Sequence, residues 1–386
     1  MKKIISLIII ILTVCLMFTS CSVNDIELKN RIIVEAIGLD ETEKGVKVTI
    51  QYLNTDLSTN PNNGGSNEKL IKNISIEDES IAAAIKKLTD IMGQEPLLSQ
   101  NRLVILGRET VNKSIVEHLD YFVRNSFIRA TVLFAISDTT AEDIITAEMG
   151  EGIIPAKEIE NTLDSQRKNS ETVSQTLYDF INLFKNKTDS PYLPIIALKD
   201  TDDEEIKEPK VISTGVFNEE SMSHEIKKEN SAAILWLNNK YKKGIVKAKL
   251  DTEEIITLSI ISSETKIKTS IKDGNPFYDI KIKCDADCLE ASKGYGTDFT
   301  KERSKKITQA ASNEIKNQII DALDVSFKEY KIDPFGFGNR LWRSETEYYS
   351  KICDNWNENL PSFEYSVNVD LDLRRIGDEG LIDNRY

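Results

Sequence analysis

The sequence predicts an α+β protein of several domains, with three expected, in which mixed sheets pack against helices. Between residues 32 and 149, apolar strand-like runs alternate with amphipathic helical runs, an order typical of an α/β layer structure. From residue 243 onward, strand-like runs come first and long helical stretches follow, as in an α+β domain. A chain of 386 residues is also longer than a single hydrophobic core usually serves.

The N-terminal α/β domain is expected over residues 21–198 and opens with a hairpin. Residues 32–40 read as a strand that ends in a turn, and residues 46–52 alternate apolar and polar side chains as a half-buried strand does. Residues 54–67, which contain Pro61-Asn62-Asn63-Gly64-Gly65, predict a flexible loop. A helix follows, opened by the acidic segment 76–80 and ended by Gly93.

The rest of this domain alternates strands and helices. Residues 102–107 are nearly all apolar, which predicts a short strand buried on both faces. The patterns that follow predict a helix over 110–125, a strand over 130–136, a helix over 140–149, a helix through 155–188 and, because of two prolines, an extended segment over 191–196.

Residues 199–242 are predicted to be a middle segment or small domain. The acidic run 200–205 is typical of a solvated loop at a domain edge. A strand over 211–217 and a helix over 231–237, which contains Trp236, are expected in this segment.

The C-terminal α+β domain is expected over residues 243–386. A tight turn at Asp273-Gly274-Asn275 divides the last two of four strand-like runs, so the runs predict a meander. A final strand alternates inward-facing residues, from Tyr365 to Leu373, with polar ones. The predicted elements are strands near 243–250, 254–262, 265–271 and 277–283, helices over 301–330 and 339–356, and a strand over 364–375.

Residues 1–20 have the pattern of an export signal. Met1-Lys2-Lys3 precedes an apolar run from Ile4 to Phe18 that is too short for a comfortable membrane span. Cys21 follows Thr19-Ser20, and this junction resembles the lipobox of bacterial lipoproteins, in which the cysteine is acylated. Two acyl chains would tether the protein to a membrane without a spanning helix. The alternative is an ordinary secretory signal followed by a chance cysteine.

Charge excludes one large class of partner. Removal of residues 1–20 takes Lys2 and Lys3 with it, which leaves 47 of the 49 basic residues against 63 acidic ones and a net charge of −16. This is the wrong sign for a nucleic-acid binder. It also argues against attachment to anionic lipid through a basic face.

The residues suited to chemistry are few. The two histidines, His118 and His224, lie in polar surroundings and predict surface side chains, and no Gly-x-Ser-x-Gly elbow occurs. We expect no catalytic residues, no metal and no cofactor. Of the body cysteines, Cys284 and Cys288 are four apart and Cys353 stands alone, so structural thiols are favoured, with an opportunistic disulfide as the alternative.

Several motifs in order resemble the Ger(x)C family, the C subunits of spore germinant receptors. The most specific match is the C-terminal signature, with further matches in the first half of the chain. The matching segments are Asp25-Ile26-Glu27-Leu28, Gly38-Leu39-Asp40, 102–107, Phe122-Val123-Arg124, Phe134-Ala135, Gly215-Val216-Phe217, Leu235-Trp236-Leu237, 332–338, Trp356, Leu360-Pro361 and 373–377.

The resemblance implies a non-catalytic lipoprotein on the outer face of the spore inner membrane, held by lipid on Cys21. Such a subunit would work with integral membrane subunits of the A and B type to trigger germination in response to nutrients. Whether it binds the germinant itself is left open. The alternatives are a lipid-anchored solute-binding protein of a transporter, which needs a deep inter-domain cleft, and an exported hydrolase that uses carboxylates.

An aromatic cluster near a turn supplies the candidate partner interface. Phe335, Phe337 and Trp342 could anchor such an interface. The more ordinary interpretation is that they pack the core of their own domain.

Overall fold

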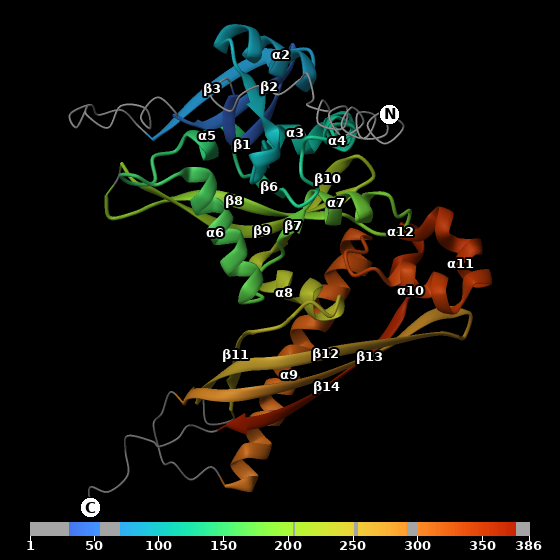
Figure 1. Cartoon of the computed structure of the whole chain (residues 1–386). Coiled ribbons are helices and arrows are strands. Elements are labelled where there is room, and N and C mark those ends of the chain that lie inside the picture. Colours follow the sequence, from blue (N-terminus) through green and yellow to red (C-terminus); the bar gives the residue numbers. More distant parts are fainter. Residues whose placement is uncertain (1–30, 55–69, 204, 251–253, 292–299, 376–386) are drawn as a thin grey trace, which may run out of the picture.

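The computed structural model describes residues 31–54, 70–203, 205–250, 254–291 and 300–375 (Figure 1). The predicted signal, Cys21 and residues 55–67 of the predicted loop lie outside these ranges. The fold is α+β, as predicted, and two mixed sheets organise it. None of the helices in the described ranges combines the length and hydropathy that crossing a bilayer requires.

The first sheet has the strand order β10-β9-β8-β6-β5-β1-β2-β3, with β4 added beside β1 and β7 beside β6. In the middle of the sheet, the pairs β1–β5, β5–β6 and β6–β8 are parallel. Toward both edges, the pairs β1–β2, β2–β3, β8–β9 and β9–β10 are antiparallel. The strands are β1 (Arg31–Thr42), β2 (Gly45–Leu53), β3 (Ile71–Asp78), β4 (Glu95–Leu97), β5 (Leu103–Leu106), β6 (Leu133–Ser137), β7 (Gln175–Thr176), β8 (Tyr192–Asp200), β9 (Lys207–Asn218) and β10 (Ser221–Lys227).

Helices cover both faces of this sheet. One core cluster combines strand residues with α2, α3, α4 and α7, and another combines them with α5 and α6. A parallel sheet buried on both faces reads as nearly continuous apolar runs, which explains the four buried residues of β5. The helices are α2 (Ile81–Met92), α3 (Arg108–Lys113), α4 (Val116–Arg124), α5 (Ala141–Thr146), α6 (Pro155–Lys168) and α7 (Leu177–Phe184).

Gly38 and Asp40 of the Gly-Leu-Asp motif hold α5 against β1. The Asp40 carboxylate accepts hydrogen bonds from the N–H groups of Ala141 at 2.7 Å and Glu142 at 3.0 Å, so it satisfies free donors at the start of α5. A Cβ on Gly38 would lie 2.8 Å from Cδ1 of Ile145, which is too close. The motif therefore has a structural role in this chain.

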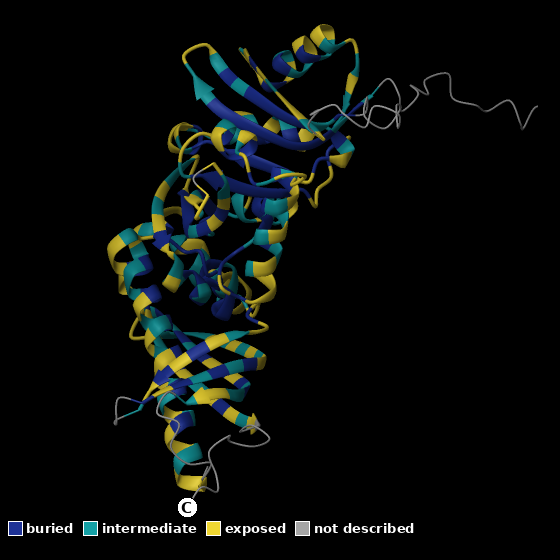
Figure 2. Ribbon diagram, turned by 90° about the vertical axis from the view of Figure 1, so that its left-hand side faces the viewer, coloured by how far each residue is buried: buried dark blue, intermediate teal, exposed yellow. Residues whose placement is uncertain are grey.

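The second sheet has the order β11-β12-β13-β14, and its last pair is parallel. Helix α9 (Lys301–Asp324) packs on one face, and buried and more exposed positions alternate along much of β12 and β13 because successive side chains point to opposite faces (Figure 2). The remaining elements are α8 (Lys228–Leu237), β11 (Gly244–Lys249), β12 (Ile255–Lys272), β13 (Asn275–Ala291), a π-helical turn (Val325–Tyr330), α10 (Phe337–Ser344), α11 (Thr346–Ile352), α12 (Trp356–Asn359), β14 (Glu364–Arg375) and 3-10 turns at Leu98–Gln100, Cys353–Asn355 and Leu360–Ser362.

The two sheets share a core. The cluster beneath the second sheet includes α8 and also Tyr192 of β8 and Val216 of β9. Strands β9 and β10 of the predicted middle segment extend the first sheet, whereas α8 of the same segment packs with the second. The domain boundaries at 198/199 and 242/243 stay predictions.

Several predicted elements differ from those observed. The helix predicted over 110–125 breaks at Ser114-Ile115 into α3 and α4, and the stretch 155–188 contains α6, β7 and α7 rather than one helix. The strands predicted at 254–262 and 265–271 form one strand, β12, with a register shift between Ile260 and Ser262. The predicted helix 339–356 consists of several short helices. Strands β3, β4, β7 and β10 were not predicted.

Candidate functional site

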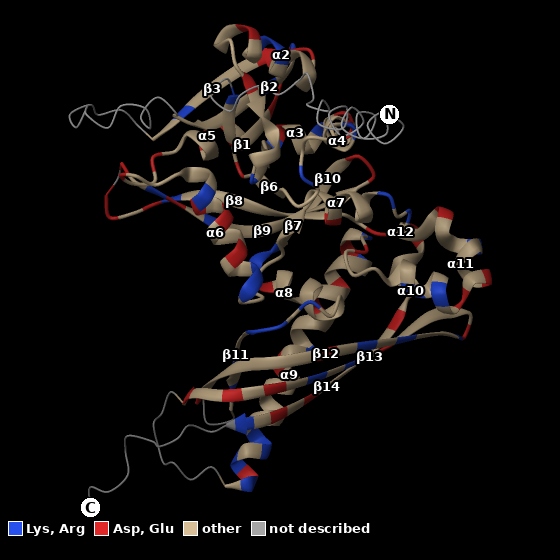
Figure 3. Ribbon diagram, in the orientation of Figure 1, with Lys and Arg blue, Asp and Glu red and all other residues tan. Residues whose placement is uncertain are grey.

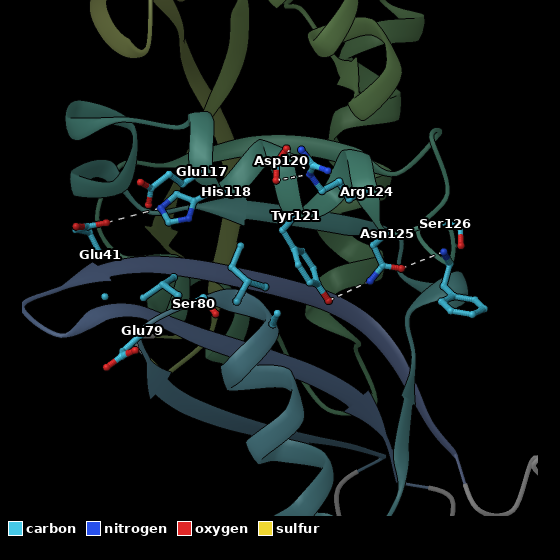
Figure 4. A pocket seen from close by; sticks show the side chains of 15 residues that line it. Glu41, Glu79, Ser80, Glu117, His118, Asp120, Tyr121, Arg124, Asn125 and Ser126 are labelled. Atoms are coloured by element: carbon cyan, nitrogen blue, oxygen red, sulfur yellow. Dashed lines mark hydrogen bonds and ion pairs between the residues drawn. The ribbon is translucent and has the colours of Figure 1, made fainter.

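A groove of about 640 Å³ lies between the start of α2, helix α4 and the turn that joins β1 to β2 (Figure 4). Ser80 caps α2 by accepting a hydrogen bond from the N–H of Ala83 at 3.2 Å, which fixes where this wall begins. The apolar lining comprises Val46, Ile81, Tyr121 and Phe127, and the acidic lining comprises Glu41, Glu79, Glu117 and Asp120.

His118 forms part of the groove wall, with only 12% of its side chain exposed. Its Nε2 atom lies 3.7 Å from Oε2 of Glu41, and the Nζ of Lys113 donates to the other oxygen of Glu41 at 3.2 Å. Burial lowers the pKa of His118, and the nearby Glu41 carboxylate opposes that shift only in part. The imidazole is therefore neutral at neutral pH. The prediction of a surface histidine was wrong here.

Tyr121 and Arg124 lie on the same side of the groove. The Tyr121 hydroxyl accepts a hydrogen bond from Nδ2 of Asn125 at 3.1 Å, and burial raises the pKa of Tyr121. Arg124 is held by Asp120, with Nε 2.7 Å from a carboxylate oxygen. Glu79 and Glu117 have no ion-pair partner in the described part of the chain.

The arrangement favours binding of a positively charged group attached to an apolar body. Glu79, just before α2, and Glu117 of α4 have no ion-pair partner among the described residues, and the same groove has the apolar lining given above. The described residues contain no group of three or more His, Cys, Asp or Glu side chains that could hold a metal ion.

A second feature is the buried loop that begins at Asp333. The Asp333 carboxylate accepts hydrogen bonds from the N–H groups of Phe335 at 3.1 Å and Gly338 at 2.9 Å. Burial raises the pKa of Asp333 to about 6, although these bonds and the charge of Arg340 act in the opposite direction. Its main chain is also bonded to Ser190, which lies just before β8. The loop therefore joins the two sheets.

Arg340 and Asp189 also belong to this contact between the two sheets, which we call the joint and which includes Ser190 and Asp333. The Arg340 guanidinium donates to the carbonyl oxygens of Gly336 and Leu237, both at 2.8 Å, so it ties α10 to the end of α8. Burial, together with the charge of Asp333, raises the pKa of Asp189 to about 7, while Arg340 lowers it. One oxygen of Asp189 is buried and has no hydrogen-bond partner.

The predicted interface residues separate into two groups. Phe335 and Phe337 are fully buried and contact each other and Phe327, so the interface prediction is wrong for these two and the core interpretation holds. Trp342 is 52% exposed, and its interface role stays a prediction. Cys284, Cys288 and Cys353 are free thiols, and His224 stacks on Tyr330.

The sequence predicted neither the groove nor the charged residues Asp189 and Arg340 at the contact between the two sheets. The groove collects residues 41–46, 79–82 and 117–127, and no one of these segments is unusual by itself. Asp189 and Arg340 are far apart in the sequence, so nothing in the sequence links them. The signal available was the unusual segment 332–338, which predicted a tight aromatic turn but not its partners.

Two family models match the chain in order. The first, the spore germination protein N-terminal domain, matches residues 24–198. The second, described as spore germination B3/GerAC like, C-terminal, matches residues 212–377.

Relatives and a solved structure agree with these matches. Spore germination protein KC of Bacillus subtilis (strain 168) is 23% identical over 371 residues, which is 91% of this chain and 91% of the relative. Spore germination protein B3 of the same organism is 20% identical over 352 residues, 89% of this chain and 91% of the relative. The crystal structure of the GerBC protein has a TM-score of 0.58 at 17% identity, over 87% of this chain and 96% of that chain, which shows a shared fold.

Proposed function

The chain belongs to the spore germination protein family that these two models describe, and we propose that it is the lipid-anchored C subunit of a spore germinant receptor. In this proposal it has no catalytic activity. It works with integral membrane subunits of the A and B type, on the outer face of the spore inner membrane, to trigger germination in response to nutrients.

The extent of the match carries the proposal. Both family models fit in order, and spore germination protein KC aligns over 91% of its own length as well as 91% of this chain. A match of this kind covers both sheets and the joint between them, rather than a single shared module. The role in spore germination follows from membership of the family.

The N-terminal segment supports the lipid anchor. Cys21 follows a charged start and a short apolar run, and only nine residues separate it from Arg31, where β1 begins. Nine extended residues reach about 30 Å, so an anchor at Cys21 would keep the first sheet close to the membrane surface. The net charge after removal of residues 1–20 gives no basic attraction to anionic lipid, so the acyl chains would carry the attachment.

The alternative of a solute-binding protein has less support. Such a protein would need a deep cleft between domains, whereas the groove described above is built from α2, α4 and the β1–β2 turn of one sheet layer. A panel of amino acids and sugars should therefore leave the melting temperature of the purified chain unchanged. A ligand that binds only the folded state would raise it.

The experiment that tests the proposal replaces Cys21 by Ala in the native host. Membrane association of the protein and the germination response of the spores to nutrients are measured together, with Cys353→Ala as the control for loss of a thiol elsewhere. Loss of both properties in Cys21→Ala, with the protein still made, supports the anchored receptor subunit. Normal germination with the protein released from the membrane would contradict it.

A further inference from the structure

The groove beside α4 carries negative charge that the fold does not neutralise. Of its four acidic side chains, Glu41 is bonded to Lys113 and Asp120 to Arg124. Glu79 and Glu117 lack such partners among the described residues, and His118 contributes no positive charge while it is neutral. Lys and Arg positions are frequent in the first turns of α9, at the far end of the molecule from this groove (Figure 3).

The same groove exposes a large aromatic ring. Phe127 follows α4 and is 75% exposed, the highest value among the exposed large apolar side chains of the described chain. It lines the groove together with Tyr121 and Ile81, so the apolar lining of the groove includes a ring that is largely open to solvent. Exposed aromatic rings next to a concave surface are typical of places where another protein binds.

We propose that this groove docks a basic, amphipathic segment of an integral membrane subunit of the same receptor. One cationic side chain of that segment lies between Glu79 and Glu117, and one large apolar side chain packs against Tyr121 and Phe127. The inference rests on the proposed function, because the occupant is a subunit of the receptor to which this chain is proposed to belong.

Charge complementarity and the exposed aromatic ring favour a protein segment as the occupant. A carboxylate on each wall attracts Lys or Arg and repels acidic segments, so the pair selects the partner as well as binding it. The apolar lining includes Ile81, Tyr121 and Phe127, and the Phe127 ring is 75% exposed, so a partner chain can reach it from outside the groove. An amphipathic segment offers both groups at once.

The test compares two charge reversals of equal size in the full, lipidated chain. Glu79→Lys with Glu117→Lys changes the groove, whereas Asp370→Lys with Asp372→Lys changes exposed positions on β14 of the other sheet. Each tagged variant is isolated from detergent-solubilised membranes of the native host, and the integral receptor subunits that accompany it are quantified. We expect the groove variant to retain about tenfold less of them than wild type, and the β14 variant to retain the wild-type amount.

Two further measurements make the result specific. Thermal unfolding of the milder variant Glu79→Gln with Glu117→Gln should match wild type, and this variant should still lose most of the integral subunits. A photo-crosslinker in place of Ala82, which lines the groove, should join the chain to a segment of an integral subunit that contains Lys or Arg beside an apolar residue. The same crosslinker in place of Leu289 on β13 should not.

The outcomes separate the two proposals. Wild-type chain that brings down no integral subunit would overturn the receptor assignment, and the docking inference with it. Wild-type chain that brings them down while the groove variants retain them equally would overturn the docking inference alone. Crosslinks from position 82 to an acidic or wholly polar segment would also overturn it.

Discussion

Ser190 and Asp333 are joined by two hydrogen bonds. The Asp333 N–H donates to Oγ of Ser190 at 2.9 Å, and the carbonyl oxygen of Asp333 accepts from the Ser190 N–H, also at 2.9 Å. Ser190 leads into β8 of the first sheet, and Asp333 begins the loop before α10, beside the second sheet. The pair is therefore a direct bond between the two halves of the chain.

Replacement of Ser190 by Ala should weaken this joint. The Asp333 N–H would stay buried without an acceptor, and an unsatisfied buried donor costs about 1–3 kcal/mol. Urea unfolding should show this loss for Ser190→Ala and almost none for Ser350→Ala, an exposed position in α11. Equal midpoints for the two variants would contradict the role of the bond.

The Asp189 carboxyl should make stability depend on pH. Its pKa of about 7 lies above the ordinary value of 3.8, so the folded protein binds a proton that the unfolded chain releases. This stabilisation is complete below about pH 4 and is lost as the pH rises through about 7. Asp189→Asn should therefore gain roughly 3–4 kcal/mol over wild type at about pH 8 and only about 1 kcal/mol at about pH 4.5. Urea titrations at both pH values measure this, and a gain that does not change with pH would exclude Asp189 as the source.

Gly338 should tolerate no side chain. A Cβ at this position would lie 2.1 Å from Oγ1 and 2.4 Å from Cβ of Thr188. Gly338→Ala should cost more than about 3 kcal/mol or prevent folding. Gly274→Ala, in a turn with φ of +83° and open space around it, should cost only about 1 kcal/mol. Soluble yield and thermal unfolding compare the two, and similar behaviour would contradict the close packing of Gly338.

Phe127 should contribute little to stability. Phe127→Ala removes a ring that is 75% exposed, so the melting temperature should stay within the range of ordinary surface changes. Phe122→Ala, five residues earlier and 2% exposed, should cost about 3–5 kcal/mol because it leaves a cavity against Phe134. A large loss for Phe127→Ala would mean that this ring packs the fold rather than serving a partner.

The three body thiols should react with alkylating reagents in a fixed order. Cys353 is partly exposed, Cys288 has a pKa raised by burial, and burial raises the pKa of Cys284 to about 12. Mass spectrometry should find Cys353 labelled first, Cys288 more slowly and Cys284 only in denaturant. Early labelling of Cys284 would show that β13 opens in the folded state.

The pattern of apolar and polar residues, together with the positions of turn residues, predicted the central strands and helices. The β1–β2 hairpin, the buried strand β5 and the end of α2 at Gly93, with φ of +68°, followed from local pattern. Strands β3 and β10 were missed because each is a polar sheet edge with few buried residues, and an edge strand does not need a strong apolar pattern. The break between α3 and α4 left no local signal, because apolar spacing continues across Ser114.

The chemistry of the site was predictable only in part. Segment 332–338 was identified as a tight aromatic turn, and it is one. The groups that surround Asp333 include Ser190 and Asp189, which lie more than 140 residues earlier in the sequence. Such long-range contacts leave no periodic pattern in the sequence. His118 illustrates the same limit, because its neighbour Glu41 belongs to a strand end that α4 reaches only in three dimensions.

The last strand of the second sheet is also the last described segment of the chain. β14 pairs in parallel with β13, and Oγ of Ser366 bonds a carboxylate oxygen of Asp279 at 2.9 Å, 87 residues earlier in sequence. During synthesis, the edge of β13 that pairs with β14 therefore stays unpaired until residues 364–375 have left the ribosome. If synthesis stopped before that point, β13 would keep an unpaired, aggregation-prone edge. We therefore expect this half of the molecule to be the half that needs a chaperone.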